Sequence, residues 1–230
     1  APLPDDGGGG GSGSDPDLLL NSYSGAVAAY SVRKLDKDYT GSAIQVRESG
    51  GGSAANIGFD SNGHLDTSVL LAHCGSNDGF VTMWYDQSGN TNDATKSNAS
   101  LQPQIVNAGS VVMENGKPAL EVDFSEMDLG VTLNGGTVMM VHQGSTSNNR
   151  QAIFGSGGNM YAPLTWDNDT NTEAFRDMSV SGTYVNGTLE SWADRDQAYH
   201  GVVGNGQQLT VFTGVTTTGA IEYLFRGRSN

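Results

Sequence analysis

The stretch from residue 79 to residue 94 constrains the fold of this chain most strongly, because an alternating strand pattern runs directly into a loop rich in Asp, Asn and Gly. Side chains on a strand point alternately to its two faces, so Phe80 and Trp84 should share one face, with Val81 and Tyr85 on the other. Both faces then carry large side chains. The pattern predicts a strand that is covered on both sides.

The five residues that follow, Asp86-Gln87-Ser88-Gly89-Asn90, should end this strand in a turn. Asp, Ser and Asn side chains hydrogen-bond their own backbone, and Gly accepts a positive φ angle. Loops that a rigid sheet holds in place often carry binding residues. We therefore expect Asp86, Gln87 and Asn90 to belong to a ligand-binding surface.

Short strands separated by turn residues continue to the C-terminus. The chain has 33 glycines, and many Asn and Ser residues lie between its apolar segments, which is typical of a sandwich or jelly roll. Asn186-Gly187 stands between two alternating segments and suits the positive φ angles of a two-residue hairpin. The further strands that we expect lie at residues 43–47, 119–124, 137–142, 151–154, 160–164, 179–185, 188–192, 209–213 and 221–226.

Two short helices are expected in the N-terminal part. Residues 67–73 follow Asp66, a good N-cap, and precede Gly75, which suits the left-handed conformation after a helix. Residues 26–35 contain several alanines, which favour a helix over a strand. After the second helix we expect only strands.

Composition limits the domain organisation and the partners. Residues 1–17 are rich in Gly and Asp and read as a flexible linker, which leaves residues 18–230 as one domain. Cys74 is the only cysteine, so the chain cannot form an intrachain disulfide. The net charge of −14 argues against binding to nucleic acid or to anionic membranes. No apolar run approaches the about 20 residues of a membrane span. We expect neither a nucleic-acid partner nor membrane insertion.

Five segments of the chain form a recognisable set, residues 30–35, 39–47, 57–59, 84–90 and 115–124. They carry a resemblance, from about residue 18 onward, to the concanavalin A-like (LamG-like) jelly-roll domains of phage tail fibres and other virion surface proteins. The same pattern is similar, more distantly, to the catalytic domain of arabinofuranosidase B. The resemblance implies an all-β, concanavalin A-like jelly-roll sandwich of two antiparallel sheets, with one or two short helices near the N-terminal part.

The resemblance also bears on the last strand. In the resembled domains a further strand follows the segment that corresponds to Gly227-Arg228-Ser229, whereas the present sequence stops at Asn230. An open central edge of a sheet invites pairing with another chain. We expect either that the domain lacks its last strand or that a neighbouring subunit supplies it.

The resemblance implies a virion or cell-surface adhesion module that recognises glycans. Its partner would be a glycan or a host-surface receptor, its location the virion surface or the extracellular space, and its state a homo-oligomer or a larger virion assembly. Sugar binding needs aromatic faces that stack on sugar rings and polar side chains that bond hydroxyl groups. Besides the loop at residues 86–90, these residue types occur together at Tyr161, Trp166, Asp167, Asn168 and Trp192.

A calcium site is a further expectation. The segment Asp167-Asn168-Asp169-Thr170-Asn171 alternates oxygen ligands as the start of an EF-hand loop does. The pattern then departs from an EF-hand, because Thr172 takes the place of the central Gly and Met178 that of the final Glu. We expect either a looser Ca²⁺ site, with Asp167, Asp169 and Asn171 as ligands or in the loop at Asp86, Asn90, Asn92 and Asp93, or turns without a metal.

Two other functions stay open. A glycoside hydrolase of arabinofuranosidase type needs two carboxylates about 5–5.5 Å or about 6.5–9.5 Å apart, and Glu121, Asp123, Glu126 and Asp128 qualify by position. The resembled enzymes carry paired cysteines near the substrate pocket, which Cys74 alone cannot supply. We therefore rank adhesion above hydrolysis and assign no catalytic residue. A purely structural capsid or tail decoration module is the third reading.

Overall fold

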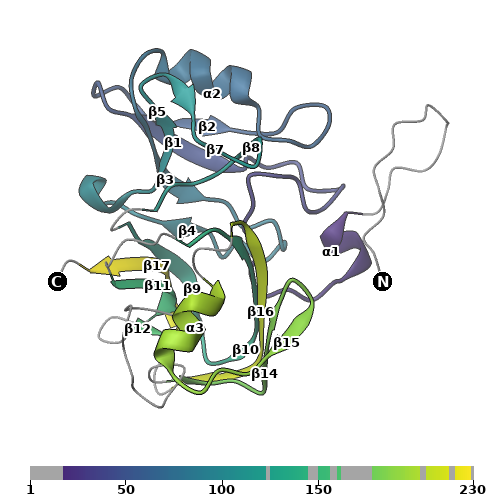
Figure 1. Cartoon of the computed structure of the whole chain (residues 1–230). Coiled ribbons are helices and arrows are strands. Elements are labelled where there is room, and N and C mark those ends of the chain that lie inside the picture. Colours follow the sequence, from purple (N-terminus) through teal and green to yellow (C-terminus); the bar gives the residue numbers. More distant parts are fainter. Residues whose placement is uncertain are drawn as a thin grey trace.

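The structure is a computed structural model that describes residues 18–122, 125–144, 150–155, 160–161, 178–202, 206–217 and 221–228. Across these residues, two antiparallel sheets and a small hairpin carry the fold, with short helices around them (Figure 1). The expected all-β class, a sandwich of antiparallel sheets, is confirmed.

The strands divide between the two sheets and the hairpin. The larger sheet contains β1 (Ile44–Glu48), β2 (Ala55–Ile57), β3 (Gly79–Trp84), β4 (Ala94–Thr95), β5 (Gln104–Asn107), β6 (Ser110–Val111), β9 (Met127–Leu133), β11 (Arg150–Gly155), β12 (Met160–Tyr161) and β17 (Ile221–Arg228). The smaller sheet contains β10 (Gly136–His142), β13 (Met178–Ser179), β14 (Gly182–Val185), β15 (Thr188–Glu190) and β16 (Gln208–Thr217). The separate hairpin joins β7 (Met113–Glu114) to β8 (Lys117–Pro118). The helices are α1 (Leu19–Ser22), α2 (Thr67–Cys74), α3 (Arg195–Val202) and the 3-10 helix η1 (Ala99–Leu101).

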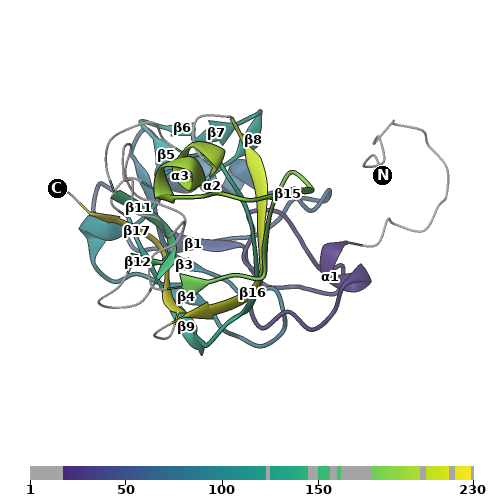
Figure 2. The ribbon, with the colours of Figure 1, turned by 60° about the horizontal axis from the view of Figure 1, so that its bottom comes forward.

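Distant parts of the chain meet in the larger sheet. Its strand order is β12-β11-β17-β9-β4-β3-β1-β2, and β5 pairs with β3 and β6. The last strand, β17, therefore lies between β11 and β9, with Leu224 opposite Met127 and Tyr223 opposite Asp128. The smaller sheet runs β10-β16-β14-β15, and β13 pairs with β16. Figures 1 and 2 both place α1 and β17 on opposite sides of the molecule.

A buried cluster joins the two sheets. Phe154 and Ile221 come from the larger sheet, and Phe212 and Val215 come from β16 of the smaller one. The rings of Phe154 and Phe212 meet edge to face, with centroids 6.0 Å apart. Burying a side chain of this size stabilises the fold by about 1.5–3 kcal/mol. This cluster is the interior of the sandwich.

A second buried cluster lies on the same face of the larger sheet, toward its N-terminal strands. Leu70 and Cys74 of α2 are buried in it, and Leu129 of β9 contacts both clusters. The expected inward position of Ile44 and Val46 is confirmed. The fully buried members are Ala43, Ile44, Val46, Ile57, Leu70, Val81, Ala94, Ile105, Val106 and Met127.

Two local predictions are confirmed in detail. Asp66 caps α2 by accepting hydrogen bonds from the backbone N–H groups of Ser68 and Val69, at 3.1 and 3.0 Å. Asn186 and Gly187 have φ angles of 50° and 84° and join β14 to β15. In both places short-range backbone chemistry determines the structure.

Other predictions are wrong. Residues 26–35 form no helix, because the side chain of Gln87 binds the backbone of this segment and replaces the helical hydrogen bonds. Alanine's helix propensity, worth less than about 1 kcal/mol per residue, does not outweigh such contacts. The rest of the chain is not only β, since α3 begins after Asp194, which accepts from the N–H of Gln197 at 2.9 Å. The alternating segment of β9 was missed.

The expected strand at residues 119–124 is reduced, within its described part, to a bridge between Gln104 and Glu121. Residues 123–124, residues 162–164 of another expected strand and the expected linker at residues 1–17 lie outside the described residues.

Candidate functional site

One face of β9 is apolar and the other is polar. Met127 is fully buried and Leu129 packs into the core, whereas Asp128 points to the opposite face. Asp128 lies opposite Thr95 of β4 on one side and Tyr223 of β17 on the other. Residues directly opposite each other share a face of the sheet. The polar face therefore collects side chains from three strands that are far apart in the sequence.

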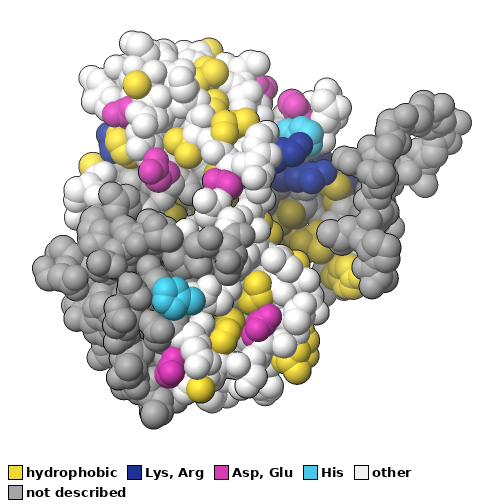
Figure 3. Space-filling model, viewed as in Figure 1, with side chains coloured by type: hydrophobic (Ala, Val, Ile, Leu, Met, Phe, Trp, Pro, Cys, Tyr) yellow, Lys and Arg dark blue, Asp and Glu magenta, His cyan; other side chains and the backbone are white. Residues whose placement is uncertain are grey.

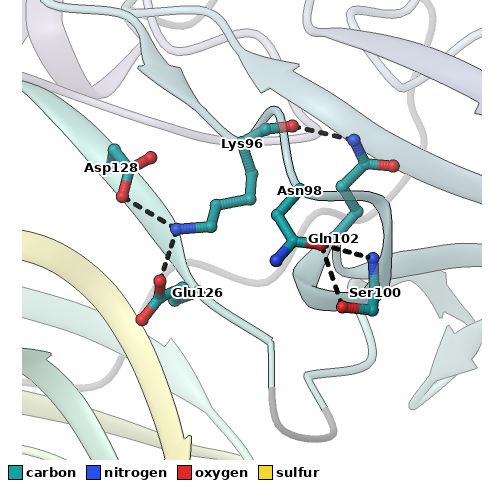
Figure 4. Close-up of polar contacts among 6 residues, drawn as sticks. All are labelled: Lys96, Asn98, Ser100, Gln102, Glu126 and Asp128. Carbon is teal, nitrogen blue, oxygen red and sulfur yellow. Dashed lines mark hydrogen bonds and ion pairs between the residues drawn. The ribbon is translucent and has the colours of Figure 1, made fainter.

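Lys96, which follows β4, joins two carboxylates on this face. Its Nζ forms ion pairs with Glu126 and with Asp128, the latter at 3.0 Å (Figure 4). The Lys96 residue is only 8% exposed. Burial alone would lower its pKa, but the hydrogen bonds to Glu126 and Asp128 outweigh burial and raise the pKa of Lys96 above its ordinary value. The ring of Tyr223 lies 5.7 Å from the Nζ atom. The ammonium group is thus held charged between two anions and an aromatic face.

A chain of hydrogen bonds fixes the backbone of Lys96. Gln102, itself 6% exposed, donates from Nε2 to the Lys96 carbonyl at 2.8 Å. Arg47 donates in turn from Nε to Oε1 of Gln102, also at 2.8 Å. Between them, Asn98 caps η1 by accepting from the N–H and the hydroxyl of Ser100 (Figure 4). The lysine is therefore positioned from its backbone as well as from its ion pairs.

The two carboxylates lie close enough for joint chemistry. Because Glu126 and Asp128 bind the same nitrogen atom, their bound oxygen atoms lie within about 6 Å of each other, the sum of two hydrogen-bond lengths. Retaining glycosidases use two carboxyl groups about 5–5.5 Å apart, a separation that this upper limit allows. Asp128 is the more accessible, with 41% of its side chain exposed against 16% for Glu126. We call Lys96, Glu126, Asp128 and Tyr223 the carboxylate cluster.

The candidate residues of the loop at 86–90 have internal partners. Asp86, 4% exposed, accepts from the backbone N–H groups of Ala29, Ser88 and Asn92 and from the Ser88 hydroxyl. Gln87, 1% exposed, accepts from the N–H of Leu35 at 2.8 Å and donates to two carbonyls of the same segment. These two side chains tie the N-terminal segment to the sheet.

Asn90 lies in the same arrangement. Its Nδ2 donates to the carbonyls of Ala26 and Val27 at 2.9 and 3.1 Å. Asn90 is exposed, unlike Asp86 and Gln87. Ligand binding by these three residues stays a prediction, and their hydrogen bonds assign them a structural role.

The remaining predicted ligand-binding residues lie elsewhere. The ring of Trp192 packs against Gly201 of α3, where an added Cβ would meet the ring at 2.6 Å. Tyr161 belongs to β12, but its side chain lies outside the described part of the chain. Trp166, Asp167 and Asn168 are outside it as well.

The expected calcium ligands Asp167, Asp169 and Asn171 also lie outside the described residues. Among the residues that are described, no group of three or more His, Cys, Asp or Glu side chains could hold a metal ion. Calcium binding stays a prediction. In the same part of the chain, no helix has the length and apolar character that crossing a membrane requires.

The fold and the carboxylate cluster together define a class of protein: an all-β sandwich with an acidic site, flanked by an aromatic ring, on one face of a sheet. The chain belongs to the family of catalytic domains of α-L-arabinofuranosidase B, whose family model matches residues 17–159. A search of curated proteins finds no match.

The chain is similar to three solved structures. A GH54 α-L-arabinofuranosidase soaked with a cyclic sulfate inhibitor is 14% identical with a TM-score of 0.42. A point mutant of such an enzyme, soaked with 4-nitrophenyl α-L-arabinofuranoside, is 15% identical with a TM-score of 0.44. An arabinofuranosidase complexed with arabinofuranosyl-α-1,2-xylobiose is 16% identical with a TM-score of 0.43. Each match covers 86% of this chain and 58% of the other, so the chain spans little more than half the length of these proteins.

The family match corrects the functional reading of the sequence. The prediction of a phage tail-fibre or virion adhesion module is wrong, because the match is to the catalytic domain of a glycoside hydrolase. The more distant of the two resemblances was the relevant one. The missing second cysteine misled the ranking, since hydrolysis of a glycoside depends on carboxylates. A glycan partner, an oligomeric state and an extracellular location stay predictions.

Sequence reasoning assigned no catalytic residue and did not single out Lys96. Glu126 and Asp128 were named among four acidic candidates, and the structure brings these two together. Glu121 lies apart, in the bridge to Gln104. A signal for Lys96 was present, because the chain contains only four lysines and this one stands in a segment rich in Asn, Thr and Ser.

Proposed function

We propose that the chain is a glycoside hydrolase domain that acts on arabinofuranosyl linkages. The observation that carries this proposal is the match of residues 17–159 to the catalytic domain family of α-L-arabinofuranosidase B. The carboxylate cluster supports it with the residue types that the reaction needs. Since the sequence identity to the solved enzymes is low, the substrate class rests on the family match.

The chemistry of the site follows from its charges. The transition state of glycoside hydrolysis carries positive charge near the anomeric carbon. A carboxylate beside that carbon stabilises this charge, most strongly where water is excluded. Asp128 is the accessible member of the pair, and we assign it to contact the sugar. Glu126, more buried, completes the pair, while Lys96 offsets the repulsion between the two anions.

Hydrolysis of 4-nitrophenyl α-L-arabinofuranoside tests the proposal. Nitrophenolate leaves readily without receiving a proton, so this assay reports on the carboxylate beside the anomeric carbon rather than on the proton donor of the pair. We expect the wild-type chain to release nitrophenolate and to release reducing sugar from arabinan. Asp128→Asn should lower kcat/KM on this substrate by about 100-fold or more, whereas Glu126→Gln should lower the release of reducing sugar from arabinan more than the release of nitrophenolate.

Glu121→Gln is the matched control, because Glu121 is an exposed carboxylate outside the cluster. It should retain wild-type activity. Absence of hydrolysis by the folded wild-type chain on both substrates would contradict the proposed function. Full activity of both cluster variants would instead refute the assignment of the site.

A further inference from the structure

A single row of paired residues crosses the larger sheet on the face that carries the carboxylate cluster. The register places one residue from each of β2, β1, β3, β4, β9 and β17 directly opposite the next, in the order Asn56, Gln45, Met83, Thr95, Asp128 and Tyr223. We call these six residues the outer row. Adjacent strands lie about 4.8 Å apart, so the outer row is about 24 Å long. Figure 1 shows the six strands one after another from β17 to β2.

The outer row faces away from the core. The next residues along β2, β1, β3 and β4 pair in the same order on the other face, and these residues, Ile57, Ile44, Trp84 and Ala94, belong to the core cluster or pack against it. In the outer row, Asn56 and Thr95 are exposed, and the Asp128 side chain is 41% exposed. The row is therefore accessible along its length, from β2 to β9.

The residue types of the outer row are unusual for so charged a chain. The sequence has 25 acidic and 11 basic residues, yet Asp128 is the one charged member of the row. Arg47 faces the same side, but its Nε donates to Gln102 and its guanidinium group lies 4.7 Å from the centroid of the Phe80 ring. The remaining members offer mainly amide, hydroxyl and aromatic groups. Such groups bond the hydroxyls of a sugar and stack on its ring.

Hydrogen bonds hold the amides of the outer row in place. Oδ1 of Asn56 accepts from the Tyr85 hydroxyl at 2.9 Å and from Nε2 of Gln45 at 3.0 Å. Oε1 of Gln45 accepts from the Thr82 hydroxyl at 2.9 Å. In the described part of the chain, no hydrogen bond uses Nδ2 of the exposed Asn56. An exposed donor that is already oriented loses little side-chain entropy when it binds a ligand.

We propose that the outer row binds the main chain of a neutral polysaccharide beside the carboxylate cluster. This inference deepens the proposed function and rests on it for the position of the reacting sugar at Asp128. Gln45 and Asn56 lie three and four strands away from Asp128, about 14 and 19 Å. One sugar ring at Asp128 does not extend that far. A polymer that carries this sugar as a branch does.

The charge of the protein favours a neutral polymer. The chain has a net charge of −14, and Figure 3 shows acidic side chains scattered over the visible face. Such a surface repels polyanions, so a polysaccharide built from uronic acids would be disfavoured. The uncharged amides and hydroxyls of the outer row need no charged partner.

Kinetics on two substrates test the assignment. Gln45→Ala and Asn56→Ala should each raise KM for arabinan by about three- to tenfold, which corresponds to the loss of one or two hydrogen bonds. Neither variant should change kcat/KM on 4-nitrophenyl α-L-arabinofuranoside by more than about twofold, because this substrate does not reach across three strands. Equal losses on both substrates would overturn the proposal.

Asn107→Ala is the matched control, since Asn107 is an exposed amide at the end of β5 and lies outside the outer row. It should keep wild-type kinetics on both substrates. Electrophoresis in gels that contain arabinan measures binding without hydrolysis. Arabinan should retard the wild-type chain and the Asn107→Ala variant, and it should retard the Gln45→Ala/Asn56→Ala double variant much less. Polygalacturonate should retard none of them.

The two measurements separate this proposal from the proposed function. Retardation that depends on Gln45 and Asn56, in a folded chain that hydrolyses neither substrate, would support the outer row and refute the hydrolase. Hydrolysis of the nitrophenyl substrate by a chain whose double variant binds arabinan as the wild type does would overturn the outer row and leave the hydrolase in place. Equal retardation by polygalacturonate and arabinan would overturn the choice of a neutral polymer.

Discussion

At the scale of single residues, Lys96 is the side chain on which the candidate site depends. It is nearly buried, and it holds two carboxylates that would otherwise repel each other, Glu126 just before β9 and Asp128 within it. Removing one partner of a buried ion pair leaves the other charge uncompensated, which costs more than the pair contributes. The cluster is therefore vulnerable to the loss of its one cation.

Lys96→Met should destabilise the chain by about 2–4 kcal/mol, somewhat less than a fully buried pair because Asp128 is partly exposed. Chemical denaturation at neutral pH measures this change. Lys117→Met is the control, since Lys117 is exposed on β8 and should tolerate the substitution. An unchanged unfolding free energy in Lys96→Met would refute the importance of the ion pairs for the fold.

At the scale of elements, the loop after β3 organises the N-terminal segment. Asp86 and Gln87 are buried and use nearly all their polar atoms on backbone groups of residues 29–35 and on their own loop. Tyr30 contributes from the other side, where its hydroxyl donates to the carbonyl of Asn92. This segment lacks regular structure, so side chains supply the hydrogen bonds that a helix would otherwise make.

Asp86→Ala should cost about 2–4 kcal/mol, because it leaves several backbone donors of a half-buried region without an acceptor. Hydrogen exchange at the Ala29 and Asn92 amides should accelerate, and residues 24–36 should become more sensitive to protease. Asp66→Ala is the comparison, because the Asp66 carboxylate accepts from the N–H groups of Ser68 and Val69 at the start of α2, outside the N-terminal segment. If both variants release the N-terminal segment equally, the contact between loop and segment is not what holds it.

At the scale of the whole molecule, β9 makes the two clusters one core. Leu129 contacts both, and β17 returns from the C-terminal part of the sequence to lie beside β9.

Three tyrosines in the described part of the chain have raised pKa values. Burial, followed by the charges of Asp93 and Asp86, raises the pKa of Tyr39 to about 12. Burial also raises the pKa values of Tyr30 and Tyr85.

These pKa shifts predict alkaline unfolding. A group whose pKa is higher in the folded state stabilises the fold below its unfolded pKa, near 10 for Tyr, and loses that contribution as the pH rises toward its folded pKa. The pKa of Lys96 is also raised in the folded state, above its ordinary value of 10.5. Its contribution to stability is therefore lost as the pH rises above that value. The unfolding free energy should therefore fall between pH 10 and about pH 12. Urea titrations at several pH values measure it.

Tyr39→Phe should make the fall of the unfolding free energy between pH 10 and about pH 12 less steep, because it removes one group whose ionisation is disfavoured in the folded state. Tyr23→Phe, at a tyrosine that is 73% exposed, should leave the slope as it is. A Tyr39→Phe slope equal to that of the wild type would contradict the assignment.

Much of the fold was accessible from local patterns, and much of the site was not. The capped helix at Asp66 and the hairpin at Asn186 follow from contacts between near neighbours in the sequence. The sequence indicates a polar loop at residues 86–90. It does not indicate whether the side chains of this loop bind a ligand or the protein's own backbone, because polar residues suit both. The structure resolves this for Asp86 and Gln87 through their burial.

The sequence by itself determined the class of the fold and the position of most strands, because the period of two and the turn residues act over a few positions. Only the tertiary structure decided which carboxylates share a cation, since Lys96, Asp128 and Tyr223 meet through the pairing of β4, β9 and β17. It also decided that the outer row faces away from the core. Alternation alone cannot say which face of a strand is buried, because that depends on what the rest of the chain packs against it.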